Sequence, residues 1–353
     1  MEEGGVERVV LSLNRALVSA GHRSIVISRG GRLEARVRAD GGETRALDLK
    51  SKNPLTFFAR AYGLRRVLRV IEGEDKAARV VVFVHSRVPA WLFLFANRTL
   101  HLPFATYAHG ANSVSSYSRV MTRGDAVVVP SQFLADFLLA NYPDAPDCPS
   151  ASRLAARLRV ISPTVDLDRF DPKKVNRTVV ARLRRAWGVE SGVFVTMSIG
   201  RITPLKGFDA VIRDFAERRK TRMFSRLVIV GGADRGKEAL LNELKALAAH
   251  LGVADHVIFA LSQTEIPECL SIADEVVSGN TTKPESFGLS VLEAAAMNKP
   301  VRVLRSFGGV AEVLSAIKAA GTATPREAVA RLYGVETMTA KTLALLDDLA
   351  RRK

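Results

Sequence analysis

The sequence predicts an α/β fold with two domains, each built on a doubly wound parallel sheet with helices on both faces. The chain has 353 residues, which is more than a single hydrophobic core usually serves. Short apolar runs rich in β-branched residues alternate with longer helical patterns, which is typical of parallel sheets. The alternation starts again near residue 193, so the sequence indicates two similar domains in tandem.

The first half is expected to supply five buried strands, because five short runs are apolar almost throughout. They span residues 23–28, 78–84, 103–108, 125–130 and 158–162. The intervening segments favour helices, at 6–20, 53–72, 87–98 and 131–141. A polar linker with one charged helix is expected near 163–190.

The second half repeats the pattern. Its strands are expected at 193–200, 226–232, 256–261, 274–279 and 299–304. The domains are therefore expected at 1–165 and 166–325, with further helices at 326–353. Ligands of such sheets bind beyond the carboxyl ends of the strands, so the loops that follow strands are the candidate site.

Composition limits the class of protein and its partners. Two widely spaced cysteines, Cys148 and Cys269, fit a reducing cytoplasm. The N-terminus lacks the order of a signal peptide, and the longest apolar run, 88–96, is too short to span a bilayer. The net charge of +16 suggests an acidic partner, namely nucleic acid, an anionic membrane surface or a phosphorylated substrate. The charge is spread over both halves, so a solvated basic surface also explains much of it.

The stretch PESFGLSVLEA, residues 284–294, separates two carboxylates, Glu285 and Glu293, by seven residues. It follows an expected strand and opens an expected helix, whose first amides would be unbonded donors and a natural anion site. These amides belong to Phe287, Gly288 and Leu289. Gly288 would let a ligand approach the backbone, and the acids could accept hydrogen bonds from sugar or ribose hydroxyls. A metal site and a helix start favoured by the macrodipole remain open.

A second loop, SIGRITPLKGFD at 198–209, favours the phosphate interpretation. It follows the first expected strand of the second half, and Arg201 and Lys206 lie five residues apart across a turn that contains proline. Two cations there suit a diphosphate, whose charge they would neutralise as a nucleotide departs. Two solvated basic residues are the alternative, but both loops falling at strand ends of one sheet favours a joint site.

These motifs give the chain a resemblance to the retaining family-4 glycosyltransferases of the GT-B fold. GRITPLKG, VIVGG and ESFGLSVLE resemble their donor domain, and EGGVERVV, VISPTVDLDRF and SFGGVAEVL resemble their other characteristic segments. The resemblance implies two Rossmann-like domains that face a cleft, with helices at 326–353 that cross back to the first domain. It also implies transfer of a sugar with retention at the anomeric carbon and no clear protein nucleophile.

Residue roles follow from the same resemblance. Arg201 and Lys206 would hold the diphosphate of the donor, and Glu293 would bind its ribose. The catalytic residues would be Glu285, which contacts the donor sugar, and His109, in YAHGAN, which faces the transferred sugar. Gly4 and Gly5 would lie beside the phosphates and acceptor. The implied donor is a UDP-, GDP- or ADP-sugar, and no cofactor or metal is expected.

Three departures from the family pattern support an alternative. The strand that precedes the glycine loop is absent, Thr164 replaces a glycine, and SAIKAAGTATPREAV replaces the usual segment after Glu312. A shortened or non-catalytic sugar-nucleotide-binding homologue would keep the same motifs. A phosphorylase of the same fold would need a pyridoxal lysine site, which the sequence does not show.

The acceptor is expected to be a glycan or a lipid-linked molecule of the cell envelope. In segment 51–71, one helix face is apolar and the other is basic. The apolar face contains Phe57, Leu64, Leu68 and Ile71, and the basic face contains Arg65, Arg66 and Arg69. Such a helix either packs on the sheet or also rests on anionic lipid at the inner face of the cytoplasmic membrane. Nucleic acid is not expected, because no basic stripe with interleaved aromatics occurs.

Overall fold

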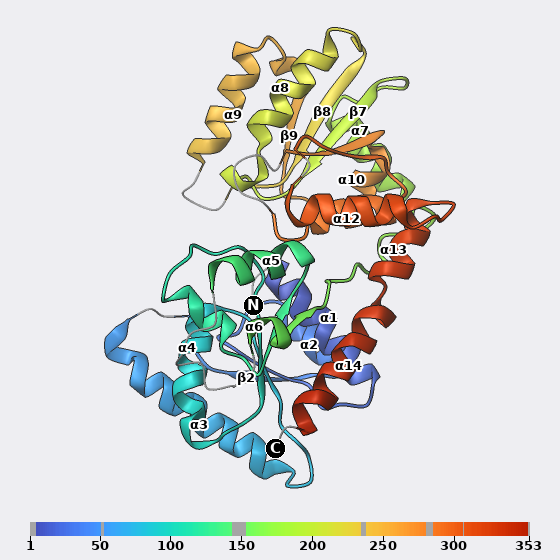
Figure 1. Ribbon diagram of the computed structural model, residues 1–353. Helices are drawn as coiled ribbons and strands as arrows, with labels where there is room; N and C mark the ends of the chain where they lie inside the picture. The colour runs from blue at the N-terminus through green and yellow to red at the C-terminus, as the bar shows by residue number, and fades with distance from the viewer. Residues whose placement is uncertain are drawn as a thin grey trace. The chain divides into compact units, whose positions relative to one another are not determined.

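The structure, a computed structural model, describes residues 5–50, 53–142, 153–233, 238–279, 285–305 and 307–351. The chain divides into two compact units (Figure 1). The first unit consists of Met1–Thr164 and Val335–Lys353, and the second of Val165–Gly334.

The first unit contains a four-stranded parallel sheet in the order β3-β4-β5-β6. Its strands are β3 (Val82–Val84), β4 (Phe104–Tyr107), β5 (Ala126–Val129) and β6 (Leu158–Val160). Every residue of β4 and β5 is buried, as their uninterrupted apolar runs predict. A separate parallel pair joins β1 (Ile25–Ser28) to β2 (Glu43–Ala46). The sequence did not predict β2, because its residues, ETRA, are mostly polar.

Helices of the first unit cover both faces of this sheet, and others pack beside it. They are α1 (Gly5–Ser19), α2 (Glu34–Ala39), α3 (Phe57–Glu74), α4 (Arg87–Ala96), α5 (Gln132–Asn141), α6 (Leu154–Arg157) and α14 (Val335–Arg351), with 3-10 turns η1 (Pro54–Thr56), η2 (Asn97–Thr99) and η3 (Ser118–Thr122). Alternate strand residues face opposite cores. On one face α3, α4 and α5 pack on Val127 and Val129, and on the other α1 and α14 pack on Tyr107 and Val128.

The second unit holds a five-stranded parallel sheet in the order β11-β10-β7-β8-β9. The strands are β7 (Phe194–Ile199), β8 (Ser225–Val230), β9 (Val257–Leu261), β10 (Glu275–Ser278) and β11 (Val301–Val303). All five predicted strands of this half are confirmed. The order reverses at β7, which lies between β8 and β10, so the carboxyl ends of β7 and β10 form a topological switch point.

Two hydrophobic cores flank this second sheet. Its helices are α7 (Arg177–Ala186), α8 (Phe208–Arg219), α9 (Ala239–His250), α10 (Ile266–Ile272), α11 (Leu289–Ala296), α12 (Gly308–Ala319) and α13 (Pro325–Tyr333), with 3-10 turns η4 (Pro204–Lys206) and η5 (Ala254–His256). Helices α8 and α9 pack on one face, and α7, α10, α11, α12 and α13 contribute to the core of the other. Figure 1 shows α8 and α9 together on one side of β8.

The two last helices, both within the expected segment 326–353, belong to different units. Helix α13 remains in the second unit because Ala328 and Val329 are buried in its core and the Tyr333 ring packs edge-on against Phe287. Arg326 also donates hydrogen bonds to backbone carbonyls of Leu167 and Ala296. Only α14 joins the first unit, where it packs beside α1 (Figure 1). No helix among the described residues is both long enough and apolar enough to cross a bilayer.

Candidate functional site

The two loops singled out by the sequence follow neighbouring strands. The loop with Arg201 and Lys206 follows β7, and the loop with Glu285 follows β10, which is hydrogen-bonded to β7. Both loops therefore lie at the switch point of the second sheet, where open parallel sheets bind ligands. Residues 280–284, which begin the second loop, lie outside the described part of the chain.

Glycines bring these loops into close contact. A Cβ added at Gly231, after β8, would lie 1.9 Å from the carbonyl oxygen of Gly200, after β7. A Cβ at Gly279, after β10, would lie 2.2 Å from the carbonyl oxygen of Gly207. No side chain fits at such distances, so glycine is required for the backbones to meet. No role was predicted for Gly200, Gly231 and Gly279, although each one directly follows a strand.

Lys206 and Glu285 form an ion pair across the switch point. The Lys206 Nζ atom lies 2.6 Å from Oε1 of Glu285, and the two side chains are 23% and 27% exposed. The aliphatic part of the Lys206 side chain packs over Gly200. A Cβ atom added at Gly200 would lie 2.8 Å from the Cε atom of Lys206. An ion pair with this much exposure contributes about 0–1 kcal/mol, so a ligand with stronger contacts can replace it.

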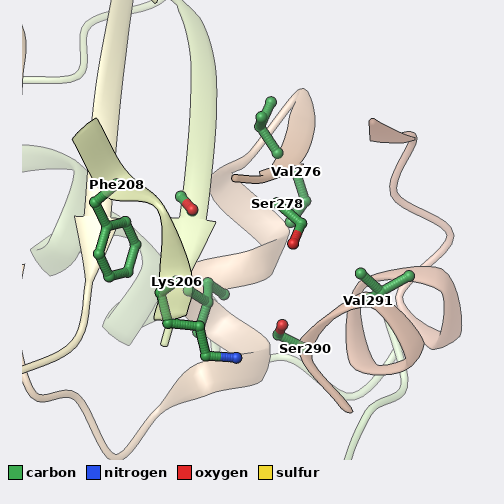
Figure 2. A pocket seen from close by; sticks show the side chains of 9 residues that line it. Lys206, Phe208, Val276, Ser278, Ser290 and Val291 are labelled. Carbon is green, nitrogen blue, oxygen red and sulfur yellow. The ribbon is translucent and has the colours of Figure 1, made fainter. Parts of the chain in front are cut away.

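A small pocket lies beside this ion pair (Figure 2). Lys206 lines it from η4, Ser278 from the end of β10, and Ser290 from the first turn of α11. The remaining lining residues are Ser198, Ile199, Phe208, Val276, Val277 and Val291. Figure 2 shows the Lys206 ammonium and the Ser290 hydroxyl on the same side of the pocket. Ser278 and Ser290 add hydroxyl groups that the sequence analysis did not single out.

The backbone amides at the start of α11 are candidate donors. The amides of Phe287, Gly288 and Leu289 have no hydrogen-bond acceptor among the described residues. An eight-residue helix that begins at Leu289 directs its positive dipole end toward this point. These amides therefore stay predicted anion-binding donors.

Gly288 has a backbone conformation and a neighbour that both favour glycine. Its φ of 86° is left-handed, and an added Cβ would lie 2.7 Å from Cγ2 of Val310 in α12. Helix α12 therefore leaves no room for a side chain at this position. The glycine is needed for this turn and for helix packing, while its amide remains a candidate donor.

Glu293 and Arg201 occupy contrasting environments. Glu293, in the second turn of α11, is buried at 7% exposure, whereas Arg201, directly after Gly200, is exposed. A buried carboxylate is costly without compensating polar contacts, so such a residue is rarely placed by chance. An exposed guanidinium in the loop after β7 can reach a ligand outside the sheet.

The first unit holds the remaining predicted residues. His109 follows β4, and its Nε2 atom lies 3.0 Å from Nδ1 of His85, which directly follows β3. Burial lowers the pKa of His85 to about 4. The pKa of His109 is held well below its ordinary value, first by burial and then by the charge of His85. His85 was not predicted, although its place at the carboxyl end of an expected strand was an available signal. Gly5 is the exposed first residue of α1. Gly4 lies outside the described residues, and so does the place where the sequence was expected to lack a strand.

The basic helix predicted near 51–71 is α3. Its apolar face is buried through Leu64, Leu68 and Ile71, and Arg66 and Arg69 are exposed, with Arg65 half-buried. The structure adds three large exposed side chains near the start of the helix, Leu55, Phe58 and Tyr62. The Arg65 guanidinium lies 5.0 Å from the centre of the Tyr62 ring. The outer surface of α3 is therefore apolar and aromatic at one end and basic further along.

Comparison with known proteins supports a relationship over most of the chain. A family model described as Glycosyltransferase Family 4 matches residues 3–169, and one described as Glycosyl transferases group 1 matches residues 180–332. A GDP-mannose-dependent alpha-(1-6)-phosphatidylinositol monomannoside mannosyltransferase of Mycolicibacterium smegmatis is 31% identical over 245 residues, which are 67% of this chain and 55% of that protein. The chain spans a third to a little over half of the length of the first curated relatives that it matches.

Solved structures share the fold. A glycosyltransferase from Rickettsia africae superposes with a TM-score of 0.81 at 22% identity, covering 100% of this chain and 97% of the other. Anabaena Alr3699/HepE, solved in complex with UDP and glucose, gives a TM-score of 0.78 at 17% identity, covering 98% and 96%. These neighbours confirm the predicted GT-B fold with two Rossmann-like domains. Because the two family models follow one another along nearly the whole chain, this protein belongs to the family-4 glycosyltransferases.

Proposed function

We propose that this protein transfers a sugar from a nucleotide-diphosphate sugar to the hydroxyl group of an acceptor. One observation carries the proposal: an ammonium, a carboxylate and the amides that begin a helix gather at the carboxyl ends of β7 and β10. They belong to Lys206, Glu285 and the start of α11. A cation and helix amides suit phosphate oxygens, and a carboxylate suits sugar hydroxyls. The Anabaena structure with UDP and glucose supports a donor of this class.

The proposed chemistry breaks the bond between the anomeric carbon and the diphosphate and forms a bond to the acceptor oxygen. The acceptor proton leaves with the diphosphate or passes to solvent. Negative charge grows on the diphosphate as its bond breaks, and Lys206, Arg201 and the α11 amides would stabilise that charge. Groups that bind the developing charge more strongly than the ground state lower the barrier. With these donors in place, the proposed reaction requires no divalent cation.

The remaining residues are proposed to position the donor. Glu285 would exchange its contact with Lys206 for sugar hydroxyls, once phosphate takes over the ammonium. Glu293 would accept hydrogen bonds from the ribose hydroxyls. His109 would contact the transferred sugar as a neutral imidazole. Retention at the anomeric carbon is part of the proposal and comes from the family resemblance.

The proposed acceptor is a lipid-linked or cell-envelope glycan that the protein reaches from the inner face of the cytoplasmic membrane. The support lies on α3, where exposed Phe58 and Tyr62 precede Arg66 and Arg69 on the outer surface. Aromatic and apolar side chains enter the headgroup region, and cations bind anionic lipids. The Mycolicibacterium relative, whose name includes a phosphatidylinositol mannoside, fits an acceptor of this class.

A panel of UDP-, GDP- and ADP-sugars tests the proposal. The protein should melt at a higher temperature with one nucleotide than with the others, because ligand binding stabilises the native state. It should also hydrolyse or transfer the matching sugar, with product configuration read by NMR of the anomeric proton. Stabilisation without turnover would favour a non-catalytic sugar-nucleotide binder, to which the Thr164 departure points. Neither stabilisation nor turnover with any donor would contradict the proposal.

A further inference from the structure

His85 and His109 come together because their strands are neighbours. Strands β3 and β4 pair in parallel, with Val84 opposite Thr106. His85 is the first residue after β3 and His109 the second after β4, so both side chains lie at the same edge of the sheet. The two rings are nearly parallel, with centroids 5.2 Å apart and an interplanar angle of 21°.

Tyr107 anchors this pair of rings. Its ring stacks on His109 at 4.4 Å between centroids and on His85 at 5.4 Å. Its hydroxyl donates a 2.7 Å hydrogen bond to the carbonyl oxygen of Ile161, after β6. A buried tyrosine whose hydroxyl is hydrogen-bonded has a fixed ring plane, and this plane sets the orientation of the rings stacked on it. The 3.0 Å contact between the histidines is therefore a feature of the packed sheet edge.

The space between His85 Nδ1 and His109 Nε2 accommodates a single hydrogen atom. Two ring nitrogens 3.0 Å apart form a hydrogen bond when one carries hydrogen and the other a lone pair. Two hydrogens would clash, and two lone pairs would repel. The tautomer of one ring therefore decides the tautomer of the other.

The ring chemistry selects one of the two arrangements. Free neutral imidazole side chains favour hydrogen on Nε2 over Nδ1. If His109 Nε2 donates to His85 Nδ1, both rings keep this favoured form. If His85 Nδ1 donates instead, both rings take the less favoured form. The first arrangement leaves Nδ1 of His109 with a free lone pair.

We propose that His85 is a positioning residue that holds His109 as a neutral imidazole with its Nε2 hydrogen donated to His85, leaving Nδ1 of His109 to accept a hydrogen bond from a substrate hydroxyl. The role of the substrate rests on the proposed function. The tautomer of His109 does not, because it is a property of the protein without ligand. The two parts can therefore be tested apart.

The first measurement is long-range ¹H–¹⁵N NMR of the ligand-free protein labelled in its six histidines. His109 should show hydrogen on Nε2 and a bare Nδ1. His85→Phe keeps an aromatic ring against Tyr107 but removes the acceptor, so His109 should shift to a mixture of tautomers. His85→Asn restores an acceptor near the position of Nδ1 and should return the parent spectrum. Hydrogen on Nδ1 of His109 in the parent, or an unchanged His109 in His85→Phe, would overturn the inference.

The second measurement is steady-state transfer with the donor that the panel identifies. In His85→Phe, kcat should fall about three- to tenfold with little change in the KM of the donor, and His85→Asn should recover most of it. His22→Asn, a change of an exposed histidine, is the matched control and should leave both values unchanged. Equal kcat in the parent and His85→Phe would overturn the positioning role. Absence of transfer by the parent would contradict the proposed function, while the NMR result would still decide whether His85 sets the tautomer.

Discussion

Lys206 contacts Glu285 at 2.6 Å although the two residues lie 79 positions apart in the sequence. The contact joins the loop after β7 to the loop after β10 and so unites the two motifs of the candidate site. The contact also places opposite charges side by side at the carboxyl ends of the two strands.

Lys206→Ala should weaken binding of a nucleoside diphosphate about tenfold or more, while binding of the nucleoside alone changes little. A hydrogen bond to a charged phosphate contributes roughly 1.5–3 kcal/mol, and the nucleoside lacks that partner. Isothermal titration calorimetry with UDP, GDP and their nucleosides measures the difference. Lys220→Ala, at an exposed lysine paired with Glu217, is the matched control and should bind as the parent does. Equal diphosphate affinity in Lys206→Ala and the parent would remove the proposed role.

Glu293→Gln should reduce the preference for a ribonucleotide over its 2′,3′-dideoxy analogue. The buried carboxylate in α11 is proposed to accept hydrogen bonds from both ribose hydroxyls, and a neutral amide accepts them less strongly. Competition binding with the two nucleotides measures the ratio of affinities. Glu243→Gln, at an exposed glutamate in α9, should keep the parent ratio. An unchanged ratio in Glu293→Gln would leave Glu293 with a structural role only.

Changing Arg65, Arg66 and Arg69 together to Gln should reduce binding to vesicles that contain anionic lipid. Each cation near an anionic leaflet contributes about 1 kcal/mol, so the loss should be large in a co-sedimentation assay. Hydrolysis of a soluble donor should remain unchanged. An equal change of charge at Arg177, Arg185 and Arg213, all exposed in the second unit, is the control. Equal loss in both triple variants would indicate a response to net charge alone.

Gly231→Ala should lower the free energy of unfolding by about 2–4 kcal/mol, because the added methyl group would meet the carbonyl oxygen of Gly200 and the φ of 151° disfavours a side chain. Nucleotide binding should weaken too, since the loops after β7 and β8 must move apart. Urea denaturation and calorimetry measure the two effects. Gly192→Ala, also at positive φ but in open space, separates backbone strain from steric overlap. Equal destabilisation by both variants would contradict the close-contact argument.

The stability of the protein should fall as the pH drops from about 6.5 toward 4. Burial lowers the pKa of His85 to about 4, below the ordinary value near 6.5, and the pKa of His109 is also lowered. Between these values the unfolded chain binds more protons than the native one, so the free energy of unfolding rises with pH across this window. Urea titrations of the parent and His85→Phe should show a shallower dependence in the variant. Identical slopes would indicate that carboxylates alone set the pH dependence.

Much of the fold could be predicted from local patterns, and the exceptions have physical reasons. Strand β5 was predictable because AVVV is apolar on both faces, as buried parallel strands require. Strand β2 was not, because Glu43 and Arg45 place charges in a strand that is only half-buried. The local sequence pattern also could not predict the unit to which α13 belongs, because that depends on the core in which Tyr333 and Val329 are buried.

The candidate site was predictable in its residue types but not in its contacts. Strand ends and charged loops are visible in the sequence, so Lys206 and Glu285 could be named. Their direct pairing depends on the lateral order of β7 and β10, which no local pattern gives. The same holds for His85, which matters only because β3 lies beside β4. The space beside Gly288 likewise depends on α12, a neighbour from another part of the chain.

The last helix sets an order of events during synthesis of the protein. The second unit is one continuous segment, Val165–Gly334, and it can fold as soon as those residues have left the ribosome. The first unit cannot finish, because Met338, Leu345 and Leu349 of α14 share a core with Ala105, Tyr107 and Val128. Until α14 has emerged, the part of that face that α14 covers stays exposed and open to chaperones or aggregation. The half of the protein that is made first is therefore the half that matures last.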